Sequence, residues 1–188
     1  MRLEPIEKPK GLMLRIAYWA SKRRLGKVMS PMKVVYARIP GVLKVSYDLA
    51  TFEEKGIKLD PALKLLVKSV TAQINECGFC MDIAEAIAVQ QHIGLEKFHA
   101  LMDYKTDPRF TERERAALAY AEEATRNKRV SDETFETLRK HFNEREIVEI
   151  TWVNALENYY NLISIPLGLE SDGLCAIAQT RATERGAA

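Results

Sequence analysis

Apolar side chains recur at helical spacing along most of this chain, and no segment alternates apolar and polar residues as a half-buried strand would. Residues 61–74, PALKLLVKSVTAQI, give the clearest helical pattern. The proline at the first position of this segment fits the first turn of a helix. The apolar residues on its common side are Leu63, Leu66, Val67, Val70 and Ile74. We therefore predict an all-α fold in which residues 61–74 form a buried helix.

Capping patterns mark where three C-terminal helices begin. The capping residues are Thr111 paired with Glu114, Ser131, and Asn143 paired with Glu146. The last of these helices carries an apolar stripe and is ended by Pro166. The stripe comprises Val148, Trp152, Ala155, Tyr159 and Ile163. After it we expect only a short helix from Ser171 and a frayed tail.

The N-terminal part of the chain is amphipathic and basic. Residues 11–24, GLMLRIAYWASKRR, have helical periodicity and a basic end, which is favourable at a helix C-terminus. We expect this segment to pack on the core or on a partner subunit, and contact with a membrane surface is the alternative. The residues that follow indicate shorter helices, broken at Pro31 and Pro40.

The composition excludes several classes of protein. A chain of 188 residues is long enough for one domain with a substantial core. The net charge of +2, without a basic stripe interleaved with aromatic residues, argues against binding to nucleic acid. No run approaches the roughly 18 apolar residues of a membrane span. Acidic residues precede the first apolar run and no small-residue cleavage site follows it, so we expect a cytoplasmic protein without a secretory signal.

Two of the three cysteines, Cys77 and Cys80, stand close together in the sequence NECGFCMDIA. Asn75 and Gly78 interrupt the helical pattern here, and a second helix then continues until Gly94. We expect the two sulfur atoms to meet at an exposed turn at the start of that helix. Unpaired N–H groups at a helix N-terminus favour a thiolate, which is the nucleophilic form. Such a thiolate could attack a peroxide or a disulfide, and its neighbour could resolve the product.

Two other roles for the cysteine pair stay open. A closed zinc site needs four ligands. Cys175 is isolated, and the three histidines (His92, His99 and His141) show no ligand spacing. The other alternative is a pair of small buried hydrophobic residues. We expect no metal and no cofactor.

The segments around and after the cysteine pair resemble the alkylhydroperoxidase D-like, carboxymuconolactone decarboxylase superfamily. The resemblance covers about residues 60–175. It is carried by LKLLVKSVTAQINECGFCMDIAEAIA and by FTERERAALAYAEEATRNKRVSDETFETLRKHFNEREIVEITWVNALENYYNLISIPLGLESDG. The resemblance implies a single all-helical domain that assembles into homo-oligomers. We expect an N-terminal helical extension (1–58), an AhpD-like core (59–175) and a C-terminal tail (176–188).

In the redox branch of this superfamily, the cysteine pair reduces peroxides with electrons from a thiol partner. The resemblance implies that Cys80 attacks a small hydroperoxide or disulfide substrate, that Cys77 resolves the product, and that an external dithiol restores the pair. The peroxidase pattern has a histidine four residues after the second cysteine and a glutamate twelve residues before the first. This chain has Ala84 and Leu65 at those places, so the usual proton relay is missing.

The remaining candidates for a proton relay are Asp82, Glu76 and Glu157. Asp82 lies roughly 200° around the helix from Cys80, so we expect it to be a solvated or subunit-facing charge. Glu76 lies next to the cysteine pair, where its charge would raise the pKa of a thiol. Glu157 lies on the long C-terminal helix.

The favoured function is a thiol–disulfide oxidoreductase with peroxidase activity. Lactone decarboxylation, the other activity for which the superfamily is named, does not need a cysteine pair. The missing relay residues favour a different alternative, a catalytically degenerate family member that acts as an oligomeric or redox-responsive binding module.

Overall fold

The computed structural model describes residues 1–186, and no strand occurs within that range. The all-α prediction is confirmed. The elements are α1 (Leu12–Leu25), a π-helix (Met32–Tyr36), α2 (Pro40–Lys55), α3 (Pro61–Ile74), α4 (Gly78–Gln90), α5 (Glu96–His99), a 3-10 helix (Leu101–Asp103), α6 (Glu112–Asn127), α7 (Asp132–Arg139), α8 (Glu144–Ser164) and α9 (Leu174–Gly186). None of these helices is long and apolar enough to cross a membrane.

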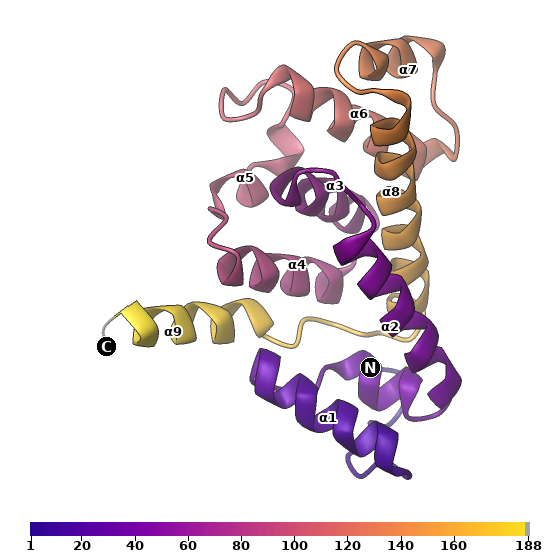
Figure 1. Ribbon diagram of the computed structural model, residues 1–188, viewed down its shortest axis with the longest axis vertical. Coiled ribbons are helices and arrows are strands. Elements are labelled where there is room, and N and C mark those ends of the chain that lie inside the picture. The colour runs from indigo at the N-terminus through magenta and orange to yellow at the C-terminus, as the bar shows by residue number, and fades with distance from the viewer. Residues whose placement is uncertain (187–188) are drawn as a thin grey trace.

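Helix α3 is the centre of the fold, where it contacts α4, α6 and α8 (Figure 1). Its bounds match the predicted helix, because Pro61 begins it and the side chain of Asp60 accepts a hydrogen bond from Leu63 N. Its buried residues lie on more than one side and are Leu63, Leu65, Leu66, Val67, Ser69, Val70, Thr71 and Ala72. A helix that is covered on several sides can hold a neighbouring turn in a fixed position.

The other local signals in the sequence are mostly confirmed. Capping boxes form at Thr111 and at Asn143, and the side chain of Ser131 caps α7. Pro31 and Pro40 stand at the starts of the π-helix and of α2. Helix α4 ends at Gln90, earlier than predicted, because His92 adopts a left-handed backbone with φ 57°.

The C-terminal part of the chain differs from the expected frayed tail. Residues Leu174–Gly186 form α9, which packs along α4, and α1 contacts α9 from the other side (Figure 1). The expectation failed because the group that begins α9 is distant in sequence. The carboxylate of Asp82, on α4, accepts hydrogen bonds from the N–H groups of Leu174 and Cys175.

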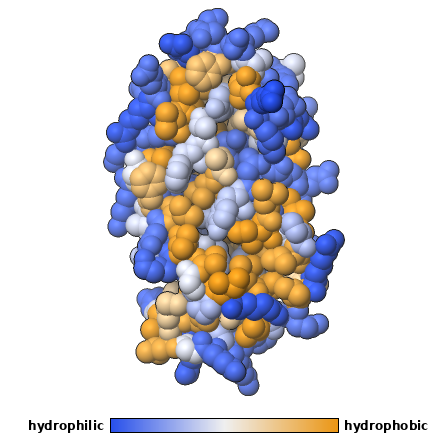
Figure 2. Space-filling view, turned by 90° about the vertical axis from the view of Figure 1, so that its right-hand side faces the viewer, coloured by the Kyte–Doolittle hydropathy of each residue, from blue (hydrophilic) through white to orange (hydrophobic). Residues whose placement is uncertain are grey.

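Helix α8 turns its apolar stripe outward. Val148 is 67% exposed and Trp152 is 42% exposed, whereas the buried side of the helix includes polar residues. These buried polar residues are Glu149, Asn154, Glu157, Asn161 and Ser164. Figure 2 looks onto the side of the molecule where α8 and α2 lie, and it shows extended apolar patches there. Helix α8 therefore has two faces with apolar residues, and the one that faces the core also carries the buried polar groups.

A buried amide joins three helices of the core. Asn154 Nδ2, on α8, donates to Thr71 Oγ1 of α3 and to Thr125 Oγ1 of α6, each at 2.8 Å. It also lies 3.3 Å from the carbonyl oxygen of Ala121. Because the amide is buried, these acceptors have no solvent to replace it.

Replacing Asn154 by alanine should therefore lower the free energy of unfolding by about 2–3 kcal/mol, since several buried acceptors lose their donor. Urea unfolding followed by circular dichroism measures this loss. Asn127→Ala is the matched control, because Asn127 is exposed at the end of α6. Equal losses in the two variants would show that the Asn154 network does not stabilise the fold.

A candidate redox site at the start of helix α4

The cysteine pair lies at the start of α4, as predicted. Cys77 is the N-cap residue and Cys80 lies in the first turn. Their sulfur atoms form a disulfide, and their Cα atoms are 5.3 Å apart. Asn75 ends α3, and Glu76 then takes a left-handed backbone conformation with φ 58°. This short reversal between two packed helices sets the spacing of the two sulfur atoms.

The backbone around the pair favours a negative charge. The first N–H of α4 that is paired within the helix is that of Met81, which donates to Cys77 O at 3.0 Å. The N–H groups before it have no acceptor within the helix, and they belong to Gly78, Phe79 and Cys80. In the reduced protein these groups stabilise a thiolate relative to a thiol. Glu76 is exposed, so solvent screens its opposing charge.

The expectation of an exposed turn is wrong. Cys77 is 1% exposed and Cys80 is 4% exposed. Apolar residues from both ends of the chain surround them, together with residues of α3 and α4. The cluster comprises Leu25, Val34, Ala72, Phe79, Ala86, Leu169, Leu174 and Ala178. A reagent can therefore reach the disulfide only when part of this apolar cluster moves away.

The segment between α8 and α9 crosses the turn that carries the cysteines. A Cβ atom placed on Gly78, between the two cysteines, would lie 3.8 Å from Ser171 N. Leu169 and Leu174, on either side of Ser171, belong to the apolar cluster around the disulfide. We call residues 169–175 the C-terminal cover.

Asp82 holds the C-terminal cover in place. Its carboxylate accepts hydrogen bonds from Ser171 Oγ at 2.9 Å, Asp172 N at 2.8 Å, Leu174 N at 3.0 Å and Cys175 N at 2.8 Å. Asp82 is buried, so the prediction of a solvated or subunit-facing charge is wrong. That prediction treated α4 alone, in which Asp82 points away from the cysteines. The space on that side is occupied by the start of α9.

A second carboxylate ties the cover to the N-terminal part of the chain. Asp172 accepts hydrogen bonds from Ser30 N at 2.6 Å and from Ser30 Oγ at 2.7 Å. Lys27 Nζ lies 3.3 Å from the same carboxylate and donates to the Asp172 carbonyl oxygen at 2.8 Å. The site is thus closed jointly by the two ends of the chain.

Glu157 lies in a buried charged cluster. Lys68 Nζ lies 3.0 Å from Glu53 Oε1 and 3.7 Å from Glu157 Oε2. One ammonium group therefore faces two carboxylates, and it is closer to Glu53. Burial, with the charge of Glu53 as a further contribution, raises the pKa of Glu157 above its ordinary value although Lys68 opposes the change. Glu157 is consequently a carboxyl group that can hold a proton.

A chain of amide side chains leads from Glu157 towards the cysteines. Asn161 Nδ2 donates to Glu157 Oε1 at 2.8 Å, and Asn75 Nδ2 donates to Asn161 Oδ1 at 2.8 Å. Asn75 stands two residues before Cys77. These contacts were not apparent in the sequence, because α3 and α8 are joined only by tertiary packing.

The other ionisable residues singled out in the sequence lie elsewhere or are engaged differently. His92 is exposed beyond the C-terminal end of α4, at the opposite end of that helix from the cysteines. Cys175 lies in the first turn of α9, where burial and the nearby Glu85 raise the pKa of its thiol to about 11. Among the side chains of residues that the structure describes, no group of three or more His, Cys, Asp and Glu could hold a metal ion.

Comparisons with known proteins agree with this fold. The sequence profile of the carboxymuconolactone decarboxylase family matches residues 44–123. The protein YnjA of Escherichia coli is 32% identical over 183 residues, which span 96% of this chain and all of YnjA.

Two solved structures have a similar fold. One is a protein of Agrobacterium tumefaciens that has been proposed to be the antioxidant defence protein AhpD. It is 27% identical, with a TM-score of 0.68, and the match covers 73% of this chain and 96% of that protein. The other is a peroxidase-related protein of Silicibacter sp. TM1040, 23% identical with a TM-score of 0.78, and the match covers 89% of this chain and 90% of that protein.

Substitution of Asp82 by asparagine should loosen the C-terminal cover. The carboxylate of Asp82 accepts with two oxygens, whereas the amide of asparagine has only one acceptor oxygen. Its NH₂ group would face the N–H groups of α9, and two donors cannot form a hydrogen bond. Hydrogen bonds to a charged acceptor are worth roughly 1.5–3 kcal/mol, so an added dithiol should reduce the Cys77–Cys80 disulfide about 10-fold faster. The rate can be followed by mass spectrometry after thiol alkylation.

Glu170→Gln is the matched control for this experiment, because it removes one negative charge from an exposed side chain of the same cover. The control should react at the wild-type rate. Equal rates in Asp82→Asn and wild type would mean that Asp82 does not govern access to the disulfide.

Proposed function

This chain belongs to the carboxymuconolactone decarboxylase family, and on that premise we propose that it is a thiol-dependent hydroperoxidase with Cys80 as the attacking residue and Cys77 as the resolving one. The observation that carries the proposal is the disulfide between them at the N-terminus of α4. A helix start that stabilises a thiolate, with a second cysteine within bonding distance, supports chemistry that cycles between a dithiol and a disulfide. The similarity to the A. tumefaciens protein supports an antioxidant role.

The proposed reaction balances with a hydroperoxide as oxidant and an external dithiol as reductant. The Cys80 thiolate attacks one peroxide oxygen, the O–O bond breaks, and the alkoxide leaves as an alcohol after taking a proton. Cys80 is then a sulfenic acid. Cys77 attacks its sulfur, the S–O bond breaks, and water leaves as the disulfide forms. The external dithiol reduces this disulfide by thiol–disulfide exchange and becomes a disulfide itself.

The proposed cycle requires the C-terminal cover to open. Local opening of a segment is an ordinary motion when few interactions hold it. Asp82 and Asp172 hold the cover by accepting hydrogen bonds, and Asp172 also forms an ion pair with Lys27. The buried side chains of Leu169 and Leu174 add apolar contacts that opening must break. We place the cycle in the cytoplasm, where thiol donors keep accessible cysteine pairs reduced.

Glu157 is the proposed store for the proton released by Cys80. Ala84 and Leu65 have no ionisable side chain at the positions where the redox branch has its relay. The carboxylate of Asp82 already accepts four hydrogen bonds from the C-terminal cover, and Glu76 is exposed to solvent. Glu157 is buried and has a raised pKa, and hydrogen bonds through Asn161 join it to Asn75, two residues before Cys77. Because amides do not pass protons, water admitted by the opened cover carries the proton from Cys80 to Glu157 in this proposal.

We further propose that the protein is a homo-oligomer, assembled through the exposed apolar residues of α2 and α8. Phe52 of α2 and Trp152 of α8 pack edge to face, with their ring centroids 5.5 Å apart, and both remain largely exposed. Other exposed apolar residues of these helices are Val45, Val148, Tyr159 and Leu162. Large exposed apolar patches of this kind mark protein–protein contacts (Figure 2).

One equivalent of a small hydroperoxide should convert the thiols of Cys77 and Cys80 in the reduced wild type into the disulfide. Cys80→Ser should show no fast loss of thiol, because neither of its remaining cysteines, Cys77 and Cys175, is the attacking residue. Cys77→Ser should stop at a sulfenic acid on Cys80, which a sulfenic-acid probe traps for mass spectrometry. If the wild-type thiols stay reduced while the protein remains folded, the peroxidase proposal is wrong.

The rate of thiol oxidation should depend on pH through Glu157. A carboxylate accepts a proton only above its pKa, and burial raises the pKa of Glu157. The oxidation rate of the reduced wild type should therefore rise with pH through this raised pKa, and Glu157→Gln should lose that rise. Glu53→Gln should keep the rise but move it to lower pH, because the charge of Glu53 contributes to the raised pKa of Glu157. Identical pH profiles for wild type and Glu157→Gln would exclude the role.

Burial of the disulfide favours a second candidate function, a redox-responsive binding module in which oxidation of the pair changes the C-terminal cover. In that case the disulfide forms and is reduced once per protein, without turnover. Consumption of excess hydroperoxide in the presence of excess dithiol separates the two functions. Catalytic turnover supports the peroxidase, and a stoichiometric change alone supports the binding module.

A further inference from the structure

Helix α1 has two apolar faces, of which only one is used within the chain. The face towards the protein buries Leu14, Tyr18, Ser21 and Leu25. The opposite face leaves four large apolar side chains in solvent. Leu12 is 71% exposed, Met13 51%, Ile16 55% and Trp19 61%. The packing of α1 on the core, one of the two expected alternatives, therefore accounts for only half of its apolar residues.

The exposed apolar residues of α1 form a ridge with basic margins. At about 100° per residue, Leu12, Ile16 and Trp19 fall within about 60° of one another. The same geometry places Arg15 and Lys22 along one margin of this ridge and Arg24 along the other. We call these residues, together with Met13, the basic apolar face of α1.

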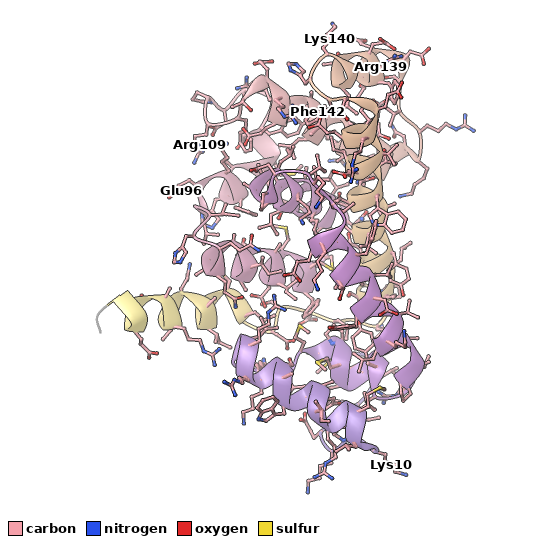
Figure 3. The ribbon with its side chains drawn as sticks, in the orientation of Figure 1. Lys10, Glu96, Arg109, Arg139, Lys140 and Phe142 are labelled. Atoms are coloured by element: carbon pink, nitrogen blue, oxygen red, sulfur yellow. A yellow bond between two sulfur atoms is a disulfide. The ribbon has the colours of Figure 1, made fainter. Side chains whose placement is uncertain are left out.

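The chain segment that carries this face has charges of one sign. Residues 8–27 contain seven of the 28 basic side chains of the chain and none of its 26 acidic ones. Arg23 also lies over the ring of Trp19, 5.4 Å from its centroid, so a cation and an indole are presented together. Lys10, just before α1, lies at one end of the molecule, whereas Arg139 and Lys140 lie at the opposite end (Figure 3).

We propose that the basic apolar face of α1 docks on an anionic lipid surface, with α1 lying in the plane of the interface. Apolar side chains enter the boundary between headgroups and acyl chains, while Lys and Arg at the margins meet anionic headgroups. Trp19 suits this boundary because its ring is apolar and its N–H is polar. This site is independent of the cysteine chemistry proposed above.

Other occupants fit this face less well. In a two-fold contact with a second copy, the face would meet itself, and the cations around it would repel one another. The phosphate backbone of a nucleic acid would satisfy the cations but would leave four apolar side chains in water. The apolar residues of α2 and α8 lack such a basic margin, which suits that surface better to contacts between copies.

Fluorescence of a single tryptophan tests the proposal directly. The chain has two tryptophans, Trp19 and Trp152, so Trp152→Phe leaves Trp19 as the only reporter. Vesicles of equal parts phosphatidylcholine and phosphatidylglycerol should shift its emission to shorter wavelength and carry the protein upward in a flotation gradient. Vesicles of phosphatidylcholine alone should do neither, and added salt should release the protein.

Two sets of charge variants provide the comparison. Arg15→Gln/Lys22→Gln/Arg24→Gln should weaken partitioning into anionic vesicles about 100-fold, since each basic residue near such a surface contributes on the order of a factor of five. Arg129→Gln/Arg139→Gln/Lys140→Gln neutralises three exposed cations outside α1, of which Arg139 and Lys140 lie at the other end of the molecule, and it should partition as the wild type does.

Three results would overturn the proposal. The first is no binding to the anionic vesicles at low salt, and the second is equal weakening by the two triple variants. The third concerns Ile16→Ser/Trp19→Ser, which alters only exposed side chains. If this variant changes the oligomeric state in size-exclusion chromatography with light scattering, the face is a contact between copies. Circular dichroism on every variant verifies that the helices are retained.

Discussion

The buried carboxylate of Asp82 is the constraint on which the arrangement of the site depends. A buried anion is costly unless donors surround it, and here three backbone N–H groups and one hydroxyl do so. The same contacts satisfy N–H groups at the start of α9 that would otherwise lack acceptors. Because Asp82 stands two residues after Cys80, the interaction that begins α9 also lays the C-terminal cover across the disulfide.

The start of α4 therefore combines two opposing effects on the cysteine pair. Its free N–H groups favour the thiolate, whereas the apolar cluster around it disfavours a buried charge and excludes reagents from the sulfur atoms. Both effects act on the same turn of α4, although the apolar cluster is supplied by several elements of the fold. The part that moves in the proposed cycle is the cover, which is attached by hydrogen bonds, by one ion pair and by the buried side chains of Leu169 and Leu174.

The surface carries two kinds of apolar region that differ in their charge. The region on α2 and α8 includes Phe52 and Trp152, and the one on α1 includes Trp19 within a strongly basic segment. Helix α8 can expose apolar residues because its inner face makes polar contacts, such as those of Asn154 with α3 and α6. Helix α8 thus has polar groups in the interior and apolar groups on its outer face. The region on α2 and α8 and the region on α1 differ in local charge, and we therefore propose a different partner for each.

Local signals in the sequence were sufficient for the helices and for the place of the cysteine pair. Pro61, the capping residues Thr111 and Asn143, and the break at Asn75 act through neighbours within four residues, so their effect is the same in most tertiary contexts. The family could also be identified from these segments, because its motifs are contiguous in the chain.

The sequence alone determined an all-α chain with two cysteines at a helix start, since helical periodicity and caps are properties of short segments. Only the tertiary structure decided that the cysteines are covered, that Asp82 caps α9, and that Glu157 shares Lys68 with Glu53. Each of these outcomes joins groups that are many residues apart. Periodicity shows that a helix has an apolar face, but which face meets the core depends on the neighbours that the whole fold brings to it.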